Sequence, residues 1–201
     1  MDKLPTERIE YLNRFQRKSD KILCAVSYLL FQYGLKKEFN IVLNSYWQKE
    51  KNGKPYLDNY NEINFNISHC CKGTVCLFDD YRCGIDIQDI SEISEDIIDI
   101  ICSKKEIDEI KSSANPKRKI CILWTLKESY VKYSGKGLTD EICNYDFSET
   151  FFKFERFGCC FSVFDMDSYI ISVCSNKFFF KDELIKLKFS DLKQFPLLLT
   201  G

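Results

Sequence analysis

The sequence predicts an α+β protein in which helices pack against small, mainly antiparallel sheets. Residues 18–31 (KSDKILCAVSYLLF) and 120–133 (ICILWTLKESYVKY) carry apolar residues at the spacing of a helix with one buried face. Short runs rich in β-branched and aromatic residues lie between these segments and after them, which is typical of strands. At 201 residues the chain can form one substantial domain or two small ones that share a core.

The first predicted helix begins near Ser19 or Asp20, since either side chain can cap a helix N-terminus. Its start is rich in basic residues. The partial positive charge of a helix N-terminus adds to theirs, which makes this a reasonable place for a phosphate. A solvated charged end is the alternative interpretation. The basic residues are Arg14, Arg17, Lys18 and Lys21.

A turn and three short strands are predicted next. Residues 51–55 (KNGKP) form the turn, and residues 64–69 (NFNISH) form a strand that ends on polar residues. Residues 74–78 and 82–87 are expected to be two antiparallel strands that pair with each other through the short connection between them.

Residues 94–133 are predicted to be mainly helical. Residues 94–110 have helical periodicity, and Ser103 with Glu106 has the spacing of a capping box that restarts a helix. A polar loop at 112–119 leads into the helix at 120–133, which the following glycines end. The segment after it predicts further strands over 151–175, including 169–174.

The composition is that of an ordinary globular protein. Hydrophobic residues make up 45%, charged residues 29%, and the formal net charge is -1, which excludes a strongly basic nucleic-acid binder and a disordered acidic tail. The first residues, MDKLPTERIEYLNRF, contain no apolar run after a charged segment. We therefore expect neither a signal peptide nor a membrane anchor, and a cytoplasmic location.

Eleven cysteines are an unusually large number for this length. Their odd count, the absence of CxxC and the single histidine argue against a zinc site. A disulfide framework is the weaker alternative, because a chain of this size needs no covalent cross-links to fold. We expect buried, reduced thiols.

Polar side chains occur at unusual positions in two predicted elements. In residues 82–90 (RCGIDIQDI), alternation points the isoleucines at 85 and 87 to one face and Asp86 to the other, although aspartate is disfavoured in strands. In the helix at 120–133, Trp124, Glu128 and Lys132 lie along one face. An ordinary Glu–Lys surface pair and a packed tryptophan explain this face equally simply.

Four motifs follow one another along the chain: GKP at 53–55, NISH at 66–69, GIDIQ at 84–88 and WTLKESYVK at 124–132. In this order and spacing they resemble the Sfp-type 4′-phosphopantetheinyl transferases, whose pattern is GKP, (F/N)-x-SH, G-(I/V)-D-(I/V)-E and W-(S/T)-x-KE-x-x-x-K. The resemblance extends over about residues 10–175. The chain length fits this type rather than the shorter, trimeric acyl-carrier-protein synthase type.

The resemblance implies the 4′-phosphopantetheinyl transferase fold, a monomer of two similar α/β halves related by a pseudo-twofold axis. Residues 1–90 would form the half with the coenzyme A-binding motifs and residues 91–201 the half with the WxxKExxxK helix, with the active site at their junction. The implied reaction is Mg²⁺-dependent transfer of 4′-phosphopantetheine from coenzyme A to a serine of an apo acyl or peptidyl carrier protein, with release of adenosine 3′,5′-bisphosphate. Carriers of fatty acid, polyketide and nonribosomal peptide synthesis are all compatible with it.

The resemblance also implies roles for individual residues. Asp86 and Glu128 match the ligands of Mg²⁺, which absorbs charge on the diphosphate as its bond breaks. Glu128, or a water that it orients, is the implied base for the attacking serine. Lys132 matches the lysine that stabilises or protonates the leaving phosphate.

Coenzyme A is expected to lie against the SH motif, Ser68 and His69, with the histidine reaching the 3′-phosphate. Glu106 matches a glutamate near the family's active site, although its capping-box role explains it equally well. The other residues implied to bind coenzyme A are Lys18, Lys21, Lys54 and Lys127.

Gln88 stands where the family usually has a second acidic residue. Its amide oxygen can approach a metal or hold a coordinated water but brings no charge, so weaker metal binding is expected. The alternative function, a non-catalytic homologue that binds coenzyme A or a carrier protein, depends on this position. Asp89 could replace the missing carboxylate only if the strand ends or bulges at Gln88.

A basic stretch between the two last motifs is a candidate docking surface for acidic carrier proteins. A solvated loop is the equally simple alternative. The residues concerned are Lys104, Lys105, Lys117, Arg118 and Lys119.

Overall fold

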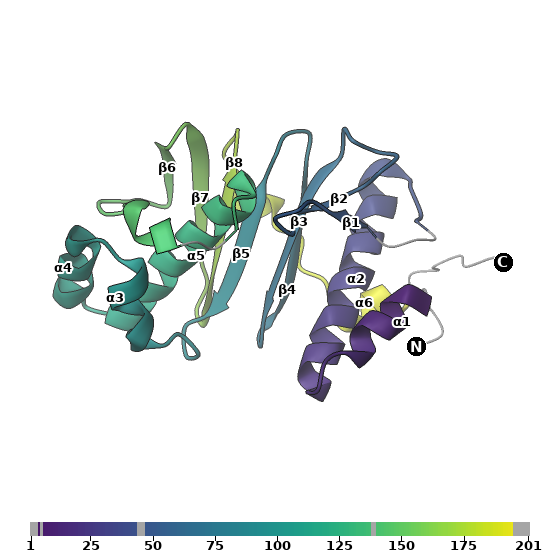
Figure 1. Cartoon of the computed structure of the whole chain (residues 1–201), viewed down its shortest axis with the longest axis horizontal. Coiled ribbons are helices and arrows are strands. Elements are labelled where there is room, and N and C mark those ends of the chain that lie inside the picture. Colours follow the sequence, from purple (N-terminus) through teal and green to yellow (C-terminus); the bar gives the residue numbers. More distant parts are fainter. Residues whose placement is uncertain (1–3, 5, 44–46, 138–139, 195–201) are drawn as a thin grey trace.

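The computed structural model describes residues 4, 6–43, 47–137 and 140–194 (Figure 1). In its N-terminal part a long helix packs against a β-hairpin, with α1 and α6 beside the helix. The elements of this part are α1 (Thr6–Asn13), α2 (Lys18–Phe39), β1 (Gln48–Lys49), β2 (Pro55–Tyr56), β3 (Asn64–Cys70) and β4 (Gly73–Asp79).

The rest of the chain forms a second layer of helices against a larger sheet. Helix α5 packs on this sheet, while α3 and α4 lie at the end of the molecule farthest from α2 (Figure 1). The elements are β5 (Gly84–Asp89), η1 (Glu95–Ile97), α3 (Ile98–Ile101), α4 (Lys104–Ser112), α5 (Pro116–Ser134), η2 (Asp140–Asn144), β6 (Lys153–Arg156), β7 (Cys159–Asp165), β8 (Tyr169–Ser175), η3 (Lys181–Glu183) and α6 (Phe189–Gln194).

The strands of the described residues form three antiparallel sheets, which makes the fold α+β as predicted. Two small sheets are the pairs β1–β2 and β3–β4, and the third has the strand order β5-β8-β7-β6. The expected pairing of residues 74–78 with 82–87 is wrong. Strand β4 pairs with β3, across the two-residue turn that joins them, and β5 pairs with β8 instead.

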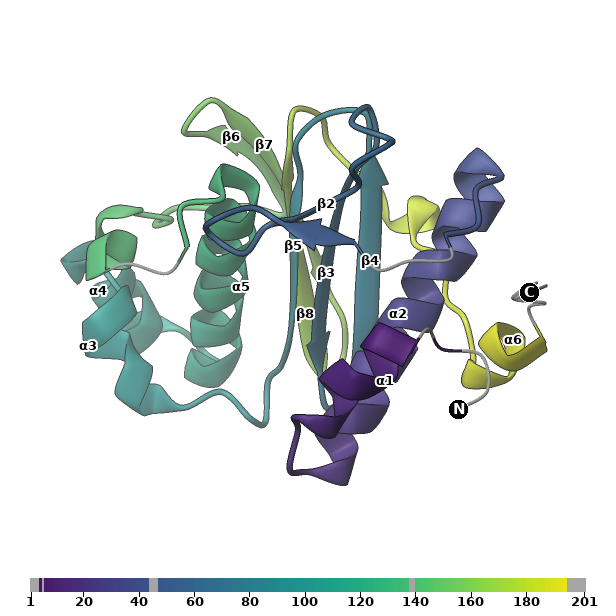
Figure 2. The ribbon, with the colours of Figure 1, turned by 45° about the vertical axis from the view of Figure 1, so that its right-hand side comes forward.

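Strand β5 therefore joins the two parts of the molecule. It is an edge strand of the larger sheet, and it also lies next to β3, as both views show (Figures 1 and 2). The side-chain oxygen Oδ1 of Asn66 accepts a hydrogen bond of 3.1 Å from the backbone N–H of Ile85. This contact links the hairpin to the larger sheet at the start of the GIDIQ motif.

Helix ends depart from the prediction in two places. Arg17, not Ser19 or Asp20, is the N-cap of α2, and it makes no side-chain capping hydrogen bond. Helix α5 begins at Pro116 rather than at residue 120, because the Asn115 side chain caps it by accepting from the N–H of Arg118 at 3.1 Å. Most of the predicted loop before α5 is thus helical.

The core consists of three clusters of buried apolar side chains. One is aromatic and joins α2 to the β3–β4 hairpin, with the rings of Phe31 and Phe65 4.6 Å apart. The largest lies between α5 and the sheet, and Trp124 packs against it, which supports the packing interpretation of this residue. The third lies around Ile85 and Ile87 and anchors β5.

All eleven cysteines are free thiols, and seven of them are buried. Burial raises the pKa of the Cys83, Cys102 and Cys121 thiols to about 12, so these side chains are protonated and behave as small apolar groups. Among the helices in the described ranges, none combines the length and the apolar character that a membrane span requires.

Candidate active site

Helix α5 lies unusually close to the backbone of β5 because residue 84 is glycine. A Cβ atom at this position would lie 2.0 Å from the carbonyl oxygen of Ser129 and 2.5 Å from the backbone nitrogen of Tyr133. A glycine within a strand often marks such a close approach. The contact brings Asp86, two residues along β5, to the face of α5 that carries Glu128 and Lys132.

Asp86 is the centre of a buried polar cluster and is 5% exposed. Its Oδ1 atom accepts hydrogen bonds of 2.6 Å from Ser68 Oγ and of 2.6 Å from Lys132 Nζ. Lys132 Nζ also lies 2.9 Å from Ser68 Oγ, so the three side chains form a closed triangle. Its members come from β3, β5 and α5, which are the elements of three different motifs.

Glu128 completes the cluster and is 8% exposed. Its Oε2 atom lies 4.0 Å from Lys132 Nζ, one helical turn away. Burial raises the pKa of Glu128 above its ordinary value; the positive charge of Lys132 opposes this shift and the negative charge of Asp86 adds to it. A buried carboxyl with a raised pKa is suited to accept a proton.

Two carboxylate oxygens of this cluster have no hydrogen-bond partner among the described residues. They are Asp86 Oδ2 and Glu128 Oε1, and both are buried. A buried carboxylate oxygen without a partner is costly, so its presence requires an explanation. Oxygen ligands of two carboxylates are what Mg²⁺ takes in proteins, and this pair fits such an ion.

Gln88 lies on the same face of β5 as Asp86, by the alternation of the strand, and its amide nitrogen donates to the backbone oxygen of Asp89 at 3.2 Å. Asp89 does not take the place of the missing carboxylate. It stays in register opposite Tyr169 and forms an ion pair of 3.3 Å with Lys72. Burial favours a higher pKa for Asp89, but hydrogen bonds, chiefly from Cys71 and Ser91, lower it below its ordinary range.

His69 directly follows Ser68 on β3 and is exposed. Burial of its ring and the charge of Lys132 lower the pKa of His69, whereas the negative charge of Asp20 in the first turn of α2 raises it. Lys18 is exposed at the first residue of α2, and Lys21 is half-buried one turn later. Thr74, which lies opposite His69 in the hairpin, is hydrogen-bonded to Ser27 of α2 at 2.8 Å, so this end of the hairpin contacts α2.

Two of the predicted coenzyme A contacts are engaged elsewhere. Lys127 is fully buried, and its ammonium forms an ion pair of 3.0 Å with Glu106 and a hydrogen bond of 2.5 Å with the backbone oxygen of Tyr145. Glu106 caps α4 together with Ser103, as its spacing predicts. Lys54 is 8% exposed and donates to two backbone carbonyls, so neither lysine belongs to the Asp86 cluster.

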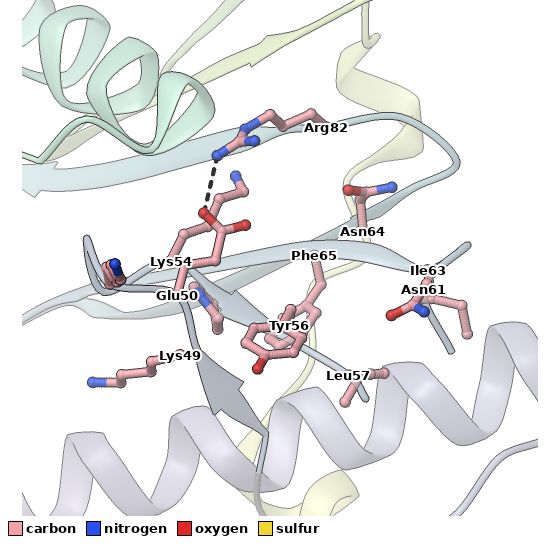
Figure 3. A pocket seen from close by; sticks show the side chains of 12 residues that line it. Lys49, Glu50, Lys54, Tyr56, Leu57, Asn61, Ile63, Asn64, Phe65 and Arg82 are labelled. Carbon is pink, nitrogen blue, oxygen red and sulfur yellow. Dashed lines mark hydrogen bonds and ion pairs between the residues drawn. The ribbon is translucent and has the colours of Figure 1, made fainter. Parts of the chain in front are cut away.

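A pocket of about 580 Å³ opens beside the GKP turn (Figure 3). Lys54 and Arg82 line its upper side, and Tyr56 and Leu57 lie across from them. Arg82 forms an ion pair of 3.3 Å with Glu50, which also lines the pocket. None of the residues of the Asp86 cluster lines this pocket.

The predicted docking surface is less basic than its sequence suggests. Arg118 forms an ion pair with Asp165, and Lys119 forms one of 2.5 Å with Glu109. Lys104, Lys105 and Lys117 are exposed. Two of the five charges are thus compensated within the protein.

Sequence reasoning missed two features of the site. The closeness of α5 to β5 depends on Gly84, which the motif GIDIQ contains but which we read only as part of the pattern. A glycine inside a strand was the available signal. Nothing in the sequence indicates that Ser68 is a hydrogen-bond partner of Asp86, because the two residues are 18 positions apart and meet only through the tertiary fold.

Comparison with known proteins finds similarity to phosphopantetheinyl transferases. Residues 82–174 match a family described as the 4′-phosphopantetheinyl transferase superfamily. The chain is 28% identical over 142 residues to the 4′-phosphopantetheinyl transferase Sfp of Bacillus subtilis, an alignment that covers 69% of this chain and 63% of that protein. It is 38% identical over 97 residues to the transferase gsp of Aneurinibacillus migulanus, covering 47% and 40% of the two chains.

A more distant relative is the L-aminoadipate-semialdehyde dehydrogenase-phosphopantetheinyl transferase of Candida glabrata, 27% identical over 133 residues, which cover 61% of this chain and 51% of that protein. Among solved structures, the holo-[acyl-carrier-protein] synthase of Thermotoga maritima aligns with a TM-score of 0.36 and 17% identity, covering 48% of this chain and 64% of that one. The matches span about 40–63% of the length of the Sfp, gsp and Candida relatives. Residues 82–174 are thus similar to the 4′-phosphopantetheinyl transferase superfamily, and the chain is similar to the Sfp-type transferases.

Proposed function

We propose that this protein is an Sfp-type transferase that moves 4′-phosphopantetheine from coenzyme A to a serine of an apo acyl or peptidyl carrier protein. The observation that carries the proposal is the pair of unpartnered, buried oxygens, Asp86 Oδ2 and Glu128 Oε1, beside the Lys132 ammonium. Three of the four resembling motifs contribute side chains to this cluster. The similarity to named transferases supports the same reaction.

The proposed reaction forms one bond and breaks another. The serine oxygen of the carrier attacks the phosphorus that bears pantetheine, and the bond from this phosphorus to the bridging oxygen of the diphosphate breaks. The serine proton passes to Glu128, whose raised pKa suits this role. Adenosine 3′,5′-bisphosphate leaves with the bridging oxygen and its negative charge, which the Lys132 ammonium stabilises.

Mg²⁺ belongs to the proposal, with Asp86 and Glu128 as its carboxylate ligands and Gln88 as a neutral third contact. When bound, it would supply charge neutralisation for the diphosphate. The start of α2, with Lys18 and Lys21, and the ring of His69 would bind the phosphates of the nucleotide. A cytoplasmic monomer is part of the same proposal.

Ser68 would contribute both to the metal site and to the coenzyme A site. Its hydroxyl holds Asp86 at 2.6 Å and lies in the strand position next to His69. It can therefore orient a metal ligand while its neighbour contacts coenzyme A. Lys127 is proposed to support the site only by stabilising α5, because its charge is paired with that of Glu106.

The proposal is tested by incubating purified protein with Mg²⁺, coenzyme A and a panel of apo carrier proteins, followed by mass spectrometry of each carrier. We expect a mass increase on the serine of at least one carrier, and its loss in Glu128→Gln. No mass increase on any carrier, despite measurable binding of coenzyme A, would favour the non-catalytic alternative.

Gln88→Glu distinguishes a weakened enzyme from an inactive one. A third carboxylate should tighten Mg²⁺ binding, so we expect the Mg²⁺ concentration for half-maximal turnover to fall about tenfold, the effect of roughly 1.4 kcal/mol. Gln88→Ala serves as the control for loss of the amide. An unchanged Mg²⁺ requirement in Gln88→Glu would show that residue 88 does not approach the metal.

A further inference from the structure

The ammonium of Lys54, in the GKP turn, connects the two elements that carry the candidate active site. Its Nζ atom donates to the backbone oxygen of Cys83 at 2.7 Å and to the backbone oxygen of Lys132 at 2.8 Å. The first carbonyl directly precedes β5, and the second belongs to the last turn of α5. These acceptors are 29 and 78 residues away in the sequence.

Both acceptors need a donor at these places. The last carbonyls of a helix have no intrahelical partner, and they carry the negative end of the helix dipole. A buried ammonium satisfies one of them with a charge-assisted hydrogen bond. Burial lowers the pKa of Lys54 to about 8, so the group is still largely protonated at neutral pH.

The residues held in this way are those next to the reacting groups. Cys83 precedes Gly84, where α5 touches β5, and Asp86 follows two positions later. Lys132 accepts from Lys54 through its backbone, while its side chain donates to Asp86. A shift of either element would therefore change the distance between Asp86 and the α5 side chains.

We propose that Lys54 is a positioning residue, which fastens the start of β5 to the end of α5 and thereby sets the geometry of Asp86, Glu128 and Lys132, rather than a ligand of coenzyme A. This inference rests on the proposed function for its consequence in catalysis. The fastening itself is independent of it. Arg82 reinforces the same junction, because its Nε donates to the backbone oxygen of Tyr133 at 2.6 Å.

The test compares Lys54→Met, which keeps the length of the side chain but removes its donors, with Lys54→Arg, which keeps charge and donors. Lys186→Met, an exposed lysine far along the chain, is the matched control. Turnover with a responsive carrier gives kcat and KM, calorimetry gives the Kd of coenzyme A, and hydrogen exchange reports on residues 82–87 and 129–135.

For Lys54→Met we expect kcat to fall about 10- to 100-fold, as for a displacement of reacting groups by about 1 Å, while the Kd of coenzyme A changes less than about twofold. Exchange should rise in both peptides together and stay unchanged in β7. Lys54→Arg should recover most of kcat. A large rise in Kd with kcat preserved would instead identify Lys54 as a contact of coenzyme A and overturn the proposal.

Two further outcomes are decisive. If the wild-type protein modifies no carrier, the proposed function fails, but the exchange of the two peptides still decides whether Lys54 fastens them. If neither variant folds while Lys186→Met does, Lys54 supports the whole fold, and its assignment as a residue that sets the site is wrong.

Discussion

At the residue scale, burial makes the ionised form of Glu128 unfavourable, since its pKa is raised in the folded protein. The folded state then binds a proton more tightly than the unfolded state, whose glutamate has a pKa of about 4.3. Stability therefore falls as the pH rises through this value toward the raised pKa. Ionisation of this buried carboxyl therefore destabilises the fold, and a role in function would explain why the residue is a glutamate.

Glu128→Gln should thus raise the free energy of unfolding at pH 7, although it removes the proposed base. The gain should shrink as the pH falls from the raised pKa toward about 4.3 and should vanish below it, where the wild-type glutamate is protonated in both the folded and the unfolded state. Urea unfolding at pH 7 and pH 3.5 measures this, with Glu95→Gln, an exposed residue, as the control. A variant less stable than the wild type at pH 7 would contradict the view that the ionised Glu128 side chain destabilises the fold.

The Lys132 ammonium lies beside the two carboxylates that are proposed to hold the metal. It lies 2.6 Å from Asp86 and 4.0 Å from Glu128, so a divalent ion must compete with this charge. Lys132→Met should raise the affinity for Mn²⁺ in the absence of coenzyme A by about tenfold or more, because a repulsion at effective ε of about 20 is removed. Titration followed by the EPR signal of free Mn²⁺ tests this. An affinity that stays the same would mean that the metal does not approach these carboxylates.

At the element scale, the packing of α5 on β5 depends on Gly84. Gly84→Ala places a Cβ 2.0 Å from the Ser129 oxygen, which belongs to backbone and cannot rotate away. Helix α5 must move, and we expect a loss of about 3 kcal/mol in the free energy of unfolding, at the upper end of overpacking costs. Gly158→Ala, with a φ of 72° and open space around it, is the control and should cost only about 1 kcal/mol. Equal losses in thermal or urea unfolding would refute the close-packing argument.

The same pair of elements shows what the sequence can and cannot reveal. Apolar periodicity located both long helices, and the capping box at Ser103 was correct, because these signals are local. The partner of β5 was predicted wrongly, since alternation defines a strand but not its neighbour, and Gly84 pairs with Cys174. Lys54 was assigned by motif to coenzyme A. That assignment stays a prediction, whereas the hydrogen bonds of Lys54 to two backbone carbonyls could not be predicted, because every residue has a backbone carbonyl.

At the scale of the whole molecule, β3 and β5 lie side by side without forming one ladder, and side chains join them. The link between Asn66 and the Ile85 N–H is buried, and another bond joins Asp79 of β4 to Ser175 of β8 at 2.5 Å. The triangle of Ser68, Asp86 and Lys132 spans this same junction. These polar contacts therefore contribute both to the cohesion of the two parts and to the alignment of the candidate site, beside the apolar cluster that packs Leu77 of β4 with Ile85 of β5.

Asn66→Ala tests this dependence, because it leaves the Ile85 N–H buried without a partner. The expected cost is about 1–3 kcal/mol in the free energy of unfolding. Since Ser68 of β3 and Asp86 of β5 lie directly beyond this contact, turnover should fall as well, by a change in kcat rather than in the Kd of coenzyme A. Asn64→Ala in the same strand removes only an exposed hydrogen bond of 3.2 Å to Asp80, so it should cost less than half as much and leave kcat nearly unchanged. If both variants lost the same stability, the junction would be held by apolar packing alone, and the side-chain link would not be what aligns β3 with β5.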